Sequence, residues 1–542
     1  MNDNLENQLD PVRRYHQRTK HSLEHFAAGP GRLDWATQPE PFRWFEGAPQ
    51  IELPLVADEL ETTYVDLYCK ERVAPQPLSQ ESIAALFELS LGLSAWKQSG
   101  GARWALRCNP SSGNLHPTEG YAIVPNVGDL SAGVYHYLSR DHLLEQRCLF
   151  DKSVLTSDVL LIGLSSIHWR EAWKYGERAF RYCQLDCGHA MAAIRYAAAV
   201  LGWSVRLLEQ WDDESISRIL GLDRKQDFAG AEQEHPDLML LVETVPSCPT
   251  MPSSEALLQA VTEGVWRGQA NQLSPYHSNE WPEIDVAVEA CLKPLTPSTE
   301  WMPSAQSDPQ QSDCRLSAAK LIRQRRSAQA FDGETTISAS QLYRMLDMTL
   351  PRPVTPPWDL LPWMPRIHLL LFIHRVDGLP SGLYLFVRRD EAETPLRSVL
   401  ANGSFEWEKV EGCPEHLRLF RLLHVDAREA AEQLSCSQAI AADSAFSLGM
   451  LAEFDRGLKA GPWGYRQLYW EAGMLGQVLY LEAEAAGVQG TGIGCYFDDA
   501  FHASLGIEGT EFQSLYHFTV GGALQDQRLM TLPPYERLAT EL

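Results

Sequence analysis

Long hydrophobic runs are absent from this 542-residue sequence. Its most apolar stretches, residues 238–242 and 369–373, are far shorter than the ~20 residues that a membrane-spanning helix needs. The amino-terminal segment, MNDNLENQLDPVRRYHQRTK, is polar and lacks the apolar centre of a secretory signal. We therefore expect a cytoplasmic protein that has no membrane as a partner.

Positive charge is also scarce, since 46 Lys and Arg residues stand against 71 Asp and Glu residues. The formal net charge of -25 repels nucleic-acid phosphates and anionic lipid headgroups, and no cluster of basic residues opposes that field locally. We therefore expect no nucleic-acid partner.

Cysteine patterns typical of disulfide frameworks or zinc sites are missing. The 11 cysteines are scattered and include no C-x-x-C pair. His21 and His25 have helical i,i+4 spacing but no apparent third ligand, while Cys183 and Cys187 lie in an apolar helical stretch and should pack in the core. The sequence thus predicts reduced thiols and no metal site.

Two diverged copies of one segment are present. Residues 180–188 recur as 465–473, and residues 133–141 recur as 382–390. Helical apolar spacing alternates with strand-like runs in each copy. Because a single core stops growing at roughly 250–300 residues, we expect an α+β protein with two tandem domains.

Composition suggests the domain boundaries. Residues 1–60 match neither copy and predict a helix followed by an extended arm, and residues 246–313 are rich in Pro, Ser and Gln, as linkers are. The first domain is therefore predicted at residues 61–245 and the second at residues 314–542.

A loop rich in small polar residues precedes a strand of the first copy. Its residues include Arg107, Pro110, Ser111, Ser112 and Asn114. Hydroxyl and amide groups beside glycine can hold a ligand that approaches closely. An ordinary Asx/Ser turn has the same composition, so the loop by itself leaves both interpretations open.

Two ordered motifs in the first copy carry a family resemblance. The loop resembles the P-S-x-x-N-x-x-P motif of nitroreductase-fold flavoproteins, and the string KYGERAFRYCQLDCGH resembles a stretch of the SagB-type dehydrogenases, which include the azoline oxidases. The resemblance implies a nitroreductase fold and FMN as cofactor. It also implies that Lys174 and Tyr175 assist proton removal from the substrate; solvation of the lysine and packing of the tyrosine are the plain alternative.

The second copy supplies different motifs. Arg325, Arg326 and Ser327 resemble the R-R-S opening of nitroreductases, whose Arg and Ser contact the FMN phosphate and ribityl chain. Gln329 stands where the family usually has Arg or Lys. A positive charge near the flavin is therefore missing or comes from elsewhere in this chain.

Glycines near the carboxyl end complete the resemblance. Gly492, Ile493 and Gly494 belong to a string that resembles the glycine-rich loop facing the flavin ring near N5, and Arg528 resembles a basic residue that reaches the flavin phosphate. A helix C-cap leading into a strand would also explain the glycines.

Each copy lacks the motifs of the other. In nitroreductase-like homodimers the resemblance implies that the two motif sets come from different subunits. We therefore expect a fused, intramolecular pseudo-dimer with one complete FMN site, and its further oligomerisation stays open.

These features predict an FMN-dependent oxidoreductase that transfers a hydride between a peptide or small-molecule substrate and flavin N5, as in SagB-type azoline or small-metabolite oxidation. One alternative is a nitro- or quinone reductase that uses NAD(P)H. Another is a catalytically degenerate flavin-binding scaffold, which Gln329 and the incomplete second site would support.

Overall fold

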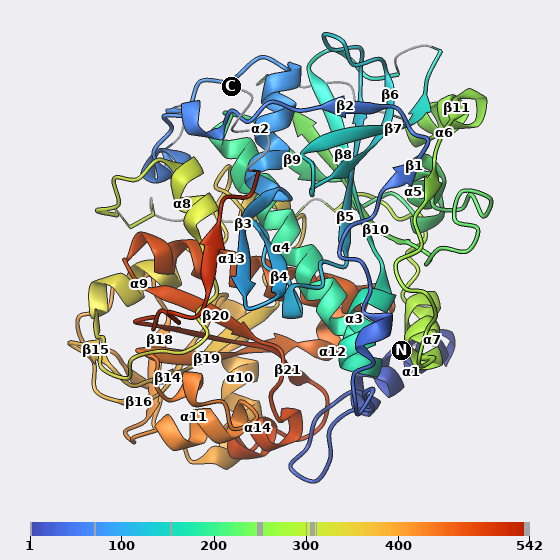
Figure 1. Ribbon diagram of the computed structural model, residues 1–542. Coiled ribbons are helices and arrows are strands. Elements are labelled where there is room, and N and C mark those ends of the chain that lie inside the picture. Colours follow the sequence, from blue (N-terminus) through green and yellow to red (C-terminus); the bar gives the residue numbers. More distant parts are fainter. Residues whose placement is uncertain are drawn as a thin grey trace.

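The computed structural model describes residues 3–69, 72–151, 154–245, 253–299, 301–303, 309–310 and 312–535. Within these ranges, two large sheets form the centres of two lobes (Figure 1). We call the sheet of β5 to β10 with β3, β4 and helices α2 to α7 the first lobe, and the sheet of β14 to β21 with helices α8 to α14 the second lobe. No helix in the described ranges has the length and apolar character needed to cross a bilayer.

The first-lobe sheet is antiparallel and follows the order β7-β6-β5-β8-β10-β9, with β11 and β2 added beside β7. Every residue of β5 and β8 is buried because helices and loops cover both faces. The strands of the main path are β5 (Thr118–Val124), β6 (Gly133–Leu138), β7 (Leu143–Leu149), β8 (Val159–Ser166), β9 (Ser204–Leu207) and β10 (His235–Glu243).

The second-lobe sheet repeats this order as β18-β16-β14-β19-β21-β20, again antiparallel, with β17 added beside β18. Equivalent strands also follow one another in the same chain order, so the lobes share one topology. The strands are β14 (Ile367–Ile373), β16 (Gly382–Phe386), β17 (Glu408–Lys409), β18 (Leu419–Leu423), β19 (Phe446–Glu453), β20 (Gln489–Ile493) and β21 (Phe512–Gly521).

After the fourth strand of each main path and a shorter helix, the chain forms a 22-residue helix. This helix is α4 (Ala179–Val200) in the first lobe and α13 (Gly464–Ala485) in the second. The two helices pack against each other where the lobes meet, and Figure 1 shows α4 running between the sheets. Every residue of α4 is buried, as expected for a helix that is covered all round.

The closest approach of these helices uses equivalent glycines. A Cβ atom on Gly188 would lie 2.3 Å from the Trp470 carbonyl oxygen, and one on Gly473 would lie 2.2 Å from the Leu185 carbonyl oxygen. Only glycine allows the two backbones to meet at this distance. The repeat found in the sequence therefore marks the contact that joins the lobes.

Other segments cross between the lobes. Strand β22 (Met530–Leu532) pairs with β3 (Leu93–Ser99), which pairs with β4 (Ala102–Arg107). Beyond β22, the Tyr535 hydroxyl accepts a hydrogen bond from the Leu93 amide. The carboxyl-terminal part of the chain is thereby fastened to the first lobe.

The amino-terminal segment folds as the predicted helix and arm, α1 (Asp3–Arg18) followed by β1 (Phe45–Glu46) and β2 (Gln50–Glu52). Strand β2 pairs with β7, so the arm extends the first-lobe sheet.

The predicted linker at residues 246–313 needs correction for residues 253–299. These residues form α6 (Ser254–Glu263), β11 (Val265–Trp266), β12 (Gln269–Ala270) and α7 (Pro282–Ala290). Strand β11 pairs with β7, and Leu257 and Val261 enter the first-lobe core. A few apolar residues at helical spacing are enough to pack these short elements against the core, although the overall composition of the segment is typical of a linker. Residues 246–252, 300, 304–308 and 311 lie outside the described residues.

The remaining elements cover the sheets. The helices are α2 (Gln80–Ser90), α3 (His168–Tyr175), α5 (Asp213–Leu220), α8 (Ala318–Gln324), α9 (Ala339–Asp347), α10 (Glu393–Val399), α11 (Arg428–Leu434), α12 (Phe454–Gly457) and α14 (Asp498–Ser504). Two short strands, β13 (Ile337–Ser338) and β15 (Val376–Asp377), pair with each other.

The helix contact predicts the effect of Gly188→Ala. Alanine normally stabilises a helix interior by roughly 0.5–1 kcal/mol over glycine, but here its Cβ meets backbone that cannot rotate away. We expect a net loss of about 1–3 kcal/mol in the free energy of unfolding, measured as a lower thermal midpoint. Gly101→Ala is the matched control because a Cβ there meets no atom within 4 Å. Equal midpoints for both variants would contradict the close approach.

Candidate functional site

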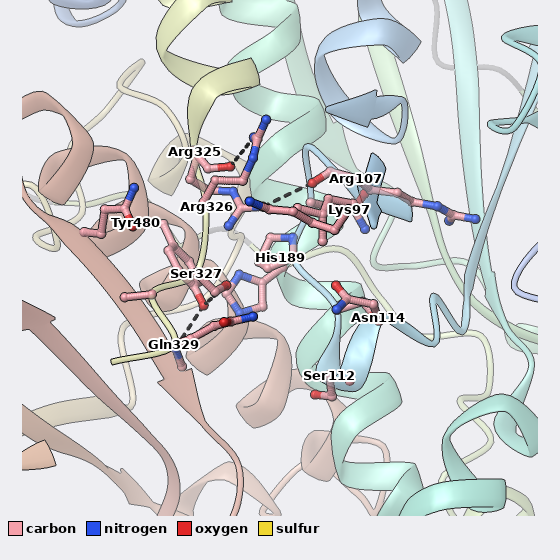
Figure 2. A pocket seen from close by; sticks show the side chains of 18 of the residues that line it. Lys97, Arg107, Ser112, Asn114, His189, Arg325, Arg326, Ser327, Gln329 and Tyr480 are labelled. Atoms are coloured by element: carbon pink, nitrogen blue, oxygen red, sulfur yellow. Dashed lines mark hydrogen bonds between the residues drawn. The ribbon is translucent and has the colours of Figure 1, made fainter. Parts of the chain in front are cut away.

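A cavity of about 280 Å³ lies at the seam between the lobes (Figure 2). The first lobe lines it with the loop between β4 and β5 and with α4, and the second lobe lines it with the segment after α8 and with β20. The motifs that the sequence divides between two copies therefore face one space. The predicted cofactor residues that line it are Arg107, Pro110, Ser111, Ser112, Asn114, Arg325, Arg326, Ser327, Gln329, Gly492 and Gly494.

The first-lobe loop has a tightly turned backbone. Gly113 and Asn114 have left-handed φ angles of 64° and 57°, which glycine and asparagine tolerate best. The Ser111 hydroxyl accepts a hydrogen bond from the His116 amide at 2.9 Å, so this serine closes the turn. The Ser112 amide donates to the Asp186 carboxylate at 3.3 Å, which ties the loop to α4.

Arg325 crosses the seam. Its guanidinium donates to the carbonyl oxygens of Arg107 at 3.1 Å and Cys108 at 3.3 Å and lies 4.9 Å above the centre of the Tyr480 ring. Its Nη1 atom is buried and has no hydrogen-bond partner among the residues described. A buried cation with an unused donor favours an anionic ligand, because leaving the donor unpaired is costly.

Two further cations lie near Arg325, and Figure 2 shows the group on one side of the cavity. Burial and the neighbouring Arg325 lower the pKa of Arg326 to about 10. Burial and Arg326 likewise lower the pKa of Lys97. Burial is the larger cause of both shifts and the repulsion between the cations adds to it, and a bound phosphate would offset both.

Arg107 lines the cavity but does not add its charge to this group. Its guanidinium donates to the Thr118 carbonyl at 2.9 Å and to the Pro41 carbonyl at 3.4 Å. The side chain is thus committed to holding the arm and β5.

The glycine-rich segment forms the edge strand β20. The Gly492 amide donates to the Tyr480 hydroxyl at 2.9 Å, and a Cβ on Gly492 would collide with the Tyr516 hydroxyl. The Gly494 carbonyl accepts from Tyr182 at 3.1 Å. Close packing against tyrosines therefore requires these glycines. The end of helix α13 is formed instead by its C-cap Ala486 and by Gly487, which follows with a left-handed φ of 77°.

Two predicted cofactor residues do not line the cavity. Ile493 is buried in the second-lobe core, because alternate residues of a strand point to opposite faces. The Arg528 side chain is 85% exposed and pairs with Asp526 at 2.8 Å. The structure therefore does not bring either side chain to the cavity.

Lys174 and Tyr175 end helix α3 and lie behind the loop. A Cβ on Gly113 would be 2.7 Å from the Tyr175 hydroxyl and 2.8 Å from Lys174 Nζ. Burial, and then the Glu171 carboxyl, raise the pKa of Tyr175 well above its ordinary value. The pair adjoins the loop that lines the cavity but is not part of the lining itself.

Asp186 lines the cavity and was not predicted as a site residue. Burial raises its pKa to about 7, against the opposing hydrogen bonds from Ser111 and Ser112. Behind it, both carboxyl oxygens of Glu171 are buried without a hydrogen-bond partner in the described ranges, and burial together with Asp186 raises the pKa of Glu171. Two acids can therefore hold a proton beside the cavity near neutral pH.

The equivalent acid in the second lobe has a different role. Glu471 accepts hydrogen bonds from the Arg366 and Ile367 amides and pairs with Arg388. The repeat aligns Asp186 with Glu471, and this alignment is the sequence signal that could have singled out Asp186. Only the structure shows that Asp186 faces a cavity whereas Glu471 pairs with an arginine.

Other unpaired polar atoms also face the cavity. Asn109 Oδ1 and His189 Nδ1 are buried without a hydrogen-bond partner in the described part of the chain. The other ring nitrogen of His189 lies 3.2 Å from the Tyr516 hydroxyl, and burial lowers the pKa of His189 to about 3, so its ring is neutral. Asn109 Oδ1 can accept and Arg325 Nη1 can donate a hydrogen bond to a polar ligand, and His189 Nδ1 offers a third position whose role depends on the ring tautomer. Within the described ranges, no group of three or more His, Cys, Asp or Glu side chains is placed to hold a metal ion.

Residues 69–231 match the nitroreductase family. The chain contains a nitroreductase-family domain. A candidate nitroreductase of Methanocaldococcus jannaschii is 22% identical over 183 residues, which cover 32% of this chain and 89% of that protein. The trifolitoxin-processing protein TfxB of Rhizobium leguminosarum bv. trifolii is 32% identical over 130 residues, which cover 21% of this chain and only 35% of that protein.

The fold of the whole chain also has a solved counterpart. A candidate nitroreductase from Anabaena variabilis superposes with a TM-score of 0.68 at 22% identity, covering 95% of this chain and 99% of the other. The fold of this chain therefore resembles that of the Anabaena protein across both lobes.

The raised pKa of Asp186 predicts a pH-dependent difference between the native protein and Asp186→Asn. The folded protein keeps this proton between about pH 4 and pH 7, where an unfolded chain has released it. The contribution of protonated Asp186 to the free energy of unfolding is fully present below pH 4 and is lost as the pH rises through 7. As the pH rises from 4 to 7, the native protein should therefore lose stability relative to Asp186→Asn. The loss is about 1.4 kcal/mol for each unit by which the folded pKa of Asp186 exceeds its unfolded pKa.

Thermal midpoints at pH 5 and pH 8 measure this change. Asp332→Asn is the control, because hydrogen bonds from Thr335 lower the pKa of that exposed carboxyl. A native-minus-variant difference for Asp186→Asn that is the same at both pH values would show that the acid is ionised throughout.

Proposed function

We propose that this protein is an FMN-dependent oxidoreductase with one cofactor site, in the cavity between its lobes. We also propose that the lobes are diverged copies of one nitroreductase-like domain that form an intramolecular pseudo-dimer. The observation that carries the proposal is the buried, unused Nη1 of Arg325, which faces a cavity lined by both motif sets.

The residues present fit the cofactor. Arg325 would hold the phosphate through its unused Nη1, and Arg326 and Lys97 would add positive charge beside it. The Arg326 guanidinium itself donates to Ser94 and to the carbonyls of Arg323 and Arg325. Asn114 and the β20 backbone would hold the ring and its ribityl chain. The neutral Gln329 lines the same cavity. Lys97 would supply, from the other lobe, the positive charge that the family's Arg or Lys brings at the position of Gln329.

Bound FMN supplies a centre that accepts or returns a hydride. The protein contributes a proton-holding group next to it, because Asp186 faces the cavity with a pKa of about 7. The loop amide of Ser112 orients this carboxyl at 3.3 Å. Lys174 and Tyr175 would act past the Gly113 loop, where their polar atoms lie close to the glycine.

We propose a peptide-derived substrate, as in SagB-type oxidation. The similarity to a trifolitoxin-processing protein supports a substrate of this kind, since the name of that protein describes the processing of a toxin. The similarity to candidate nitroreductases supports the alternative, reduction of nitro compounds or quinones with NAD(P)H. Anaerobic mixing of the flavin-loaded protein with NADPH separates them: persistence of the flavin absorbance favours the oxidase, and rapid bleaching favours the reductase.

The cofactor proposal predicts one FMN per chain, measured by absorbance of flavin released from purified protein. Arg325→Ala should raise the dissociation constant for added FMN about 10- to 100-fold, because hydrogen bonds to charged groups contribute roughly 1.5–3 kcal/mol. Flavin fluorescence titration of stripped protein provides the measurement.

Arg428→Ala is the matched control and should bind FMN unchanged, since its side chain is exposed, pairs with Asp426 and does not line the cavity. Thermal midpoints check that Arg325→Ala remains folded despite losing its two carbonyl contacts. Two flavins per chain would contradict the single site, and a protein that binds none would favour the scaffold alternative.

A further inference from the structure

Two thiols lie close together just outside the cavity. Cys495 directly follows the cavity-lining Gly494, and Cys436 lies in the turn after α11. Their sulfur atoms are 2.7 Å apart, and both residues are partly exposed. A disulfide bond is about 2.05 Å long, so a small movement would join them. The buried Cys183 and Cys187, by contrast, are core residues as predicted.

The surroundings make the two thiols unequal. The Ala27 amide donates to His21 Nδ1 at 2.9 Å, so the ring proton is on Nε2. The pKa of Cys495 is lowered to about 5, first by the hydrogen bond with Cys436 and then by the hydrogen bond with His21 and the charge of Arg178. The same sulfur–sulfur hydrogen bond raises the pKa of Cys436. The neighbouring His21 and Arg178 therefore favour the thiolate form at Cys495 over that at Cys436.

The backbone holds the sulfur atoms in place. Cys436 and Ser437 have left-handed φ angles of 54° and 56°, each at a cost of roughly 1–2 kcal/mol for a residue with a side chain. The side-chain amide of Gln438 donates through Nε2 to the Cys495 carbonyl at 3.0 Å and to the Ser435 carbonyl at 2.7 Å. Such local strain is typical of functional sites.

We propose that Cys436 and Cys495 form a redox-active dithiol that reduces disulfides by thiol–disulfide exchange. The Cys495 thiolate attacks one sulfur of an external disulfide, whose S–S bond breaks to release one thiol that takes up a proton from water. Cys436 then loses its proton to water and attacks Cys495 Sγ, which releases the second thiol. Two protein thiols are oxidised to a disulfide as the external disulfide is reduced, and the step does not depend on FMN.

The test uses full-length protein with Cys69→Ser, because Cys69 is an exposed thiol that would react by itself. The protein is reduced, freed of reductant and mixed with oxidised glutathione, and its peptides are mapped by mass spectrometry. We expect a disulfide between Cys436 and Cys495 and two equivalents of reduced glutathione per chain. Absence of that linked peptide in folded protein would overturn the proposal.

Single variants test the order of attack. Cys436→Ser should stop at a stable glutathione adduct on Cys495, whereas Cys495→Ser should react at least tenfold more slowly at Cys436. Cys413→Ser is the control, because Cys413 is also partly exposed and its pKa is raised to about 12 by burial. Equal adduct formation at Cys436 and Cys495 in the two single variants would exclude Cys495 as the attacking thiolate.

Discussion

The contact between α4 and α13 is the constraint on which the rest of the structure depends. Because Gly188 and Gly473 bring two helix backbones together, the lobes meet closely enough for Arg325 to reach carbonyl oxygens on the opposite lobe. The cavity is the space left at this seam. A wider helix separation would break the bonds from Arg325 and open the cavity to solvent.

Charge is handled differently at two places on the seam. Asp498 is fully buried and accepts from Arg178 at 3.0 Å and from Arg181 at 2.9 Å, so two cations share one carboxylate, whose pKa is strongly lowered. In the cavity, Arg325 has no carboxylate within ion-pair distance among the described residues. At Asp498 the protein pairs two buried arginines with its own carboxylate. In the cavity, the unused Nη1 of Arg325 leaves that role to a ligand.

One short segment serves several purposes. Gly492 and Gly494 line the cavity, Cys495 meets Cys436, and Asp498 anchors the first lobe. The cavity lining, the thiol pair and the contact between the lobes therefore lie within a few residues of one another along the chain.

The sequence by itself determined the α+β class, the repeat and most of the motif residues that line the cavity, because periodicity and local strings survive in the chain regardless of how it folds. The tertiary structure decided the rest. Strand alternation directs Ile493 into the core, and an exposed loop keeps Arg528 paired with Asp526. Asp186 became a site residue through burial, and Cys436 met Cys495 only because α11 and β20 end side by side. Such contacts join residues far apart in the chain, and neither composition nor spacing encodes the distance between them.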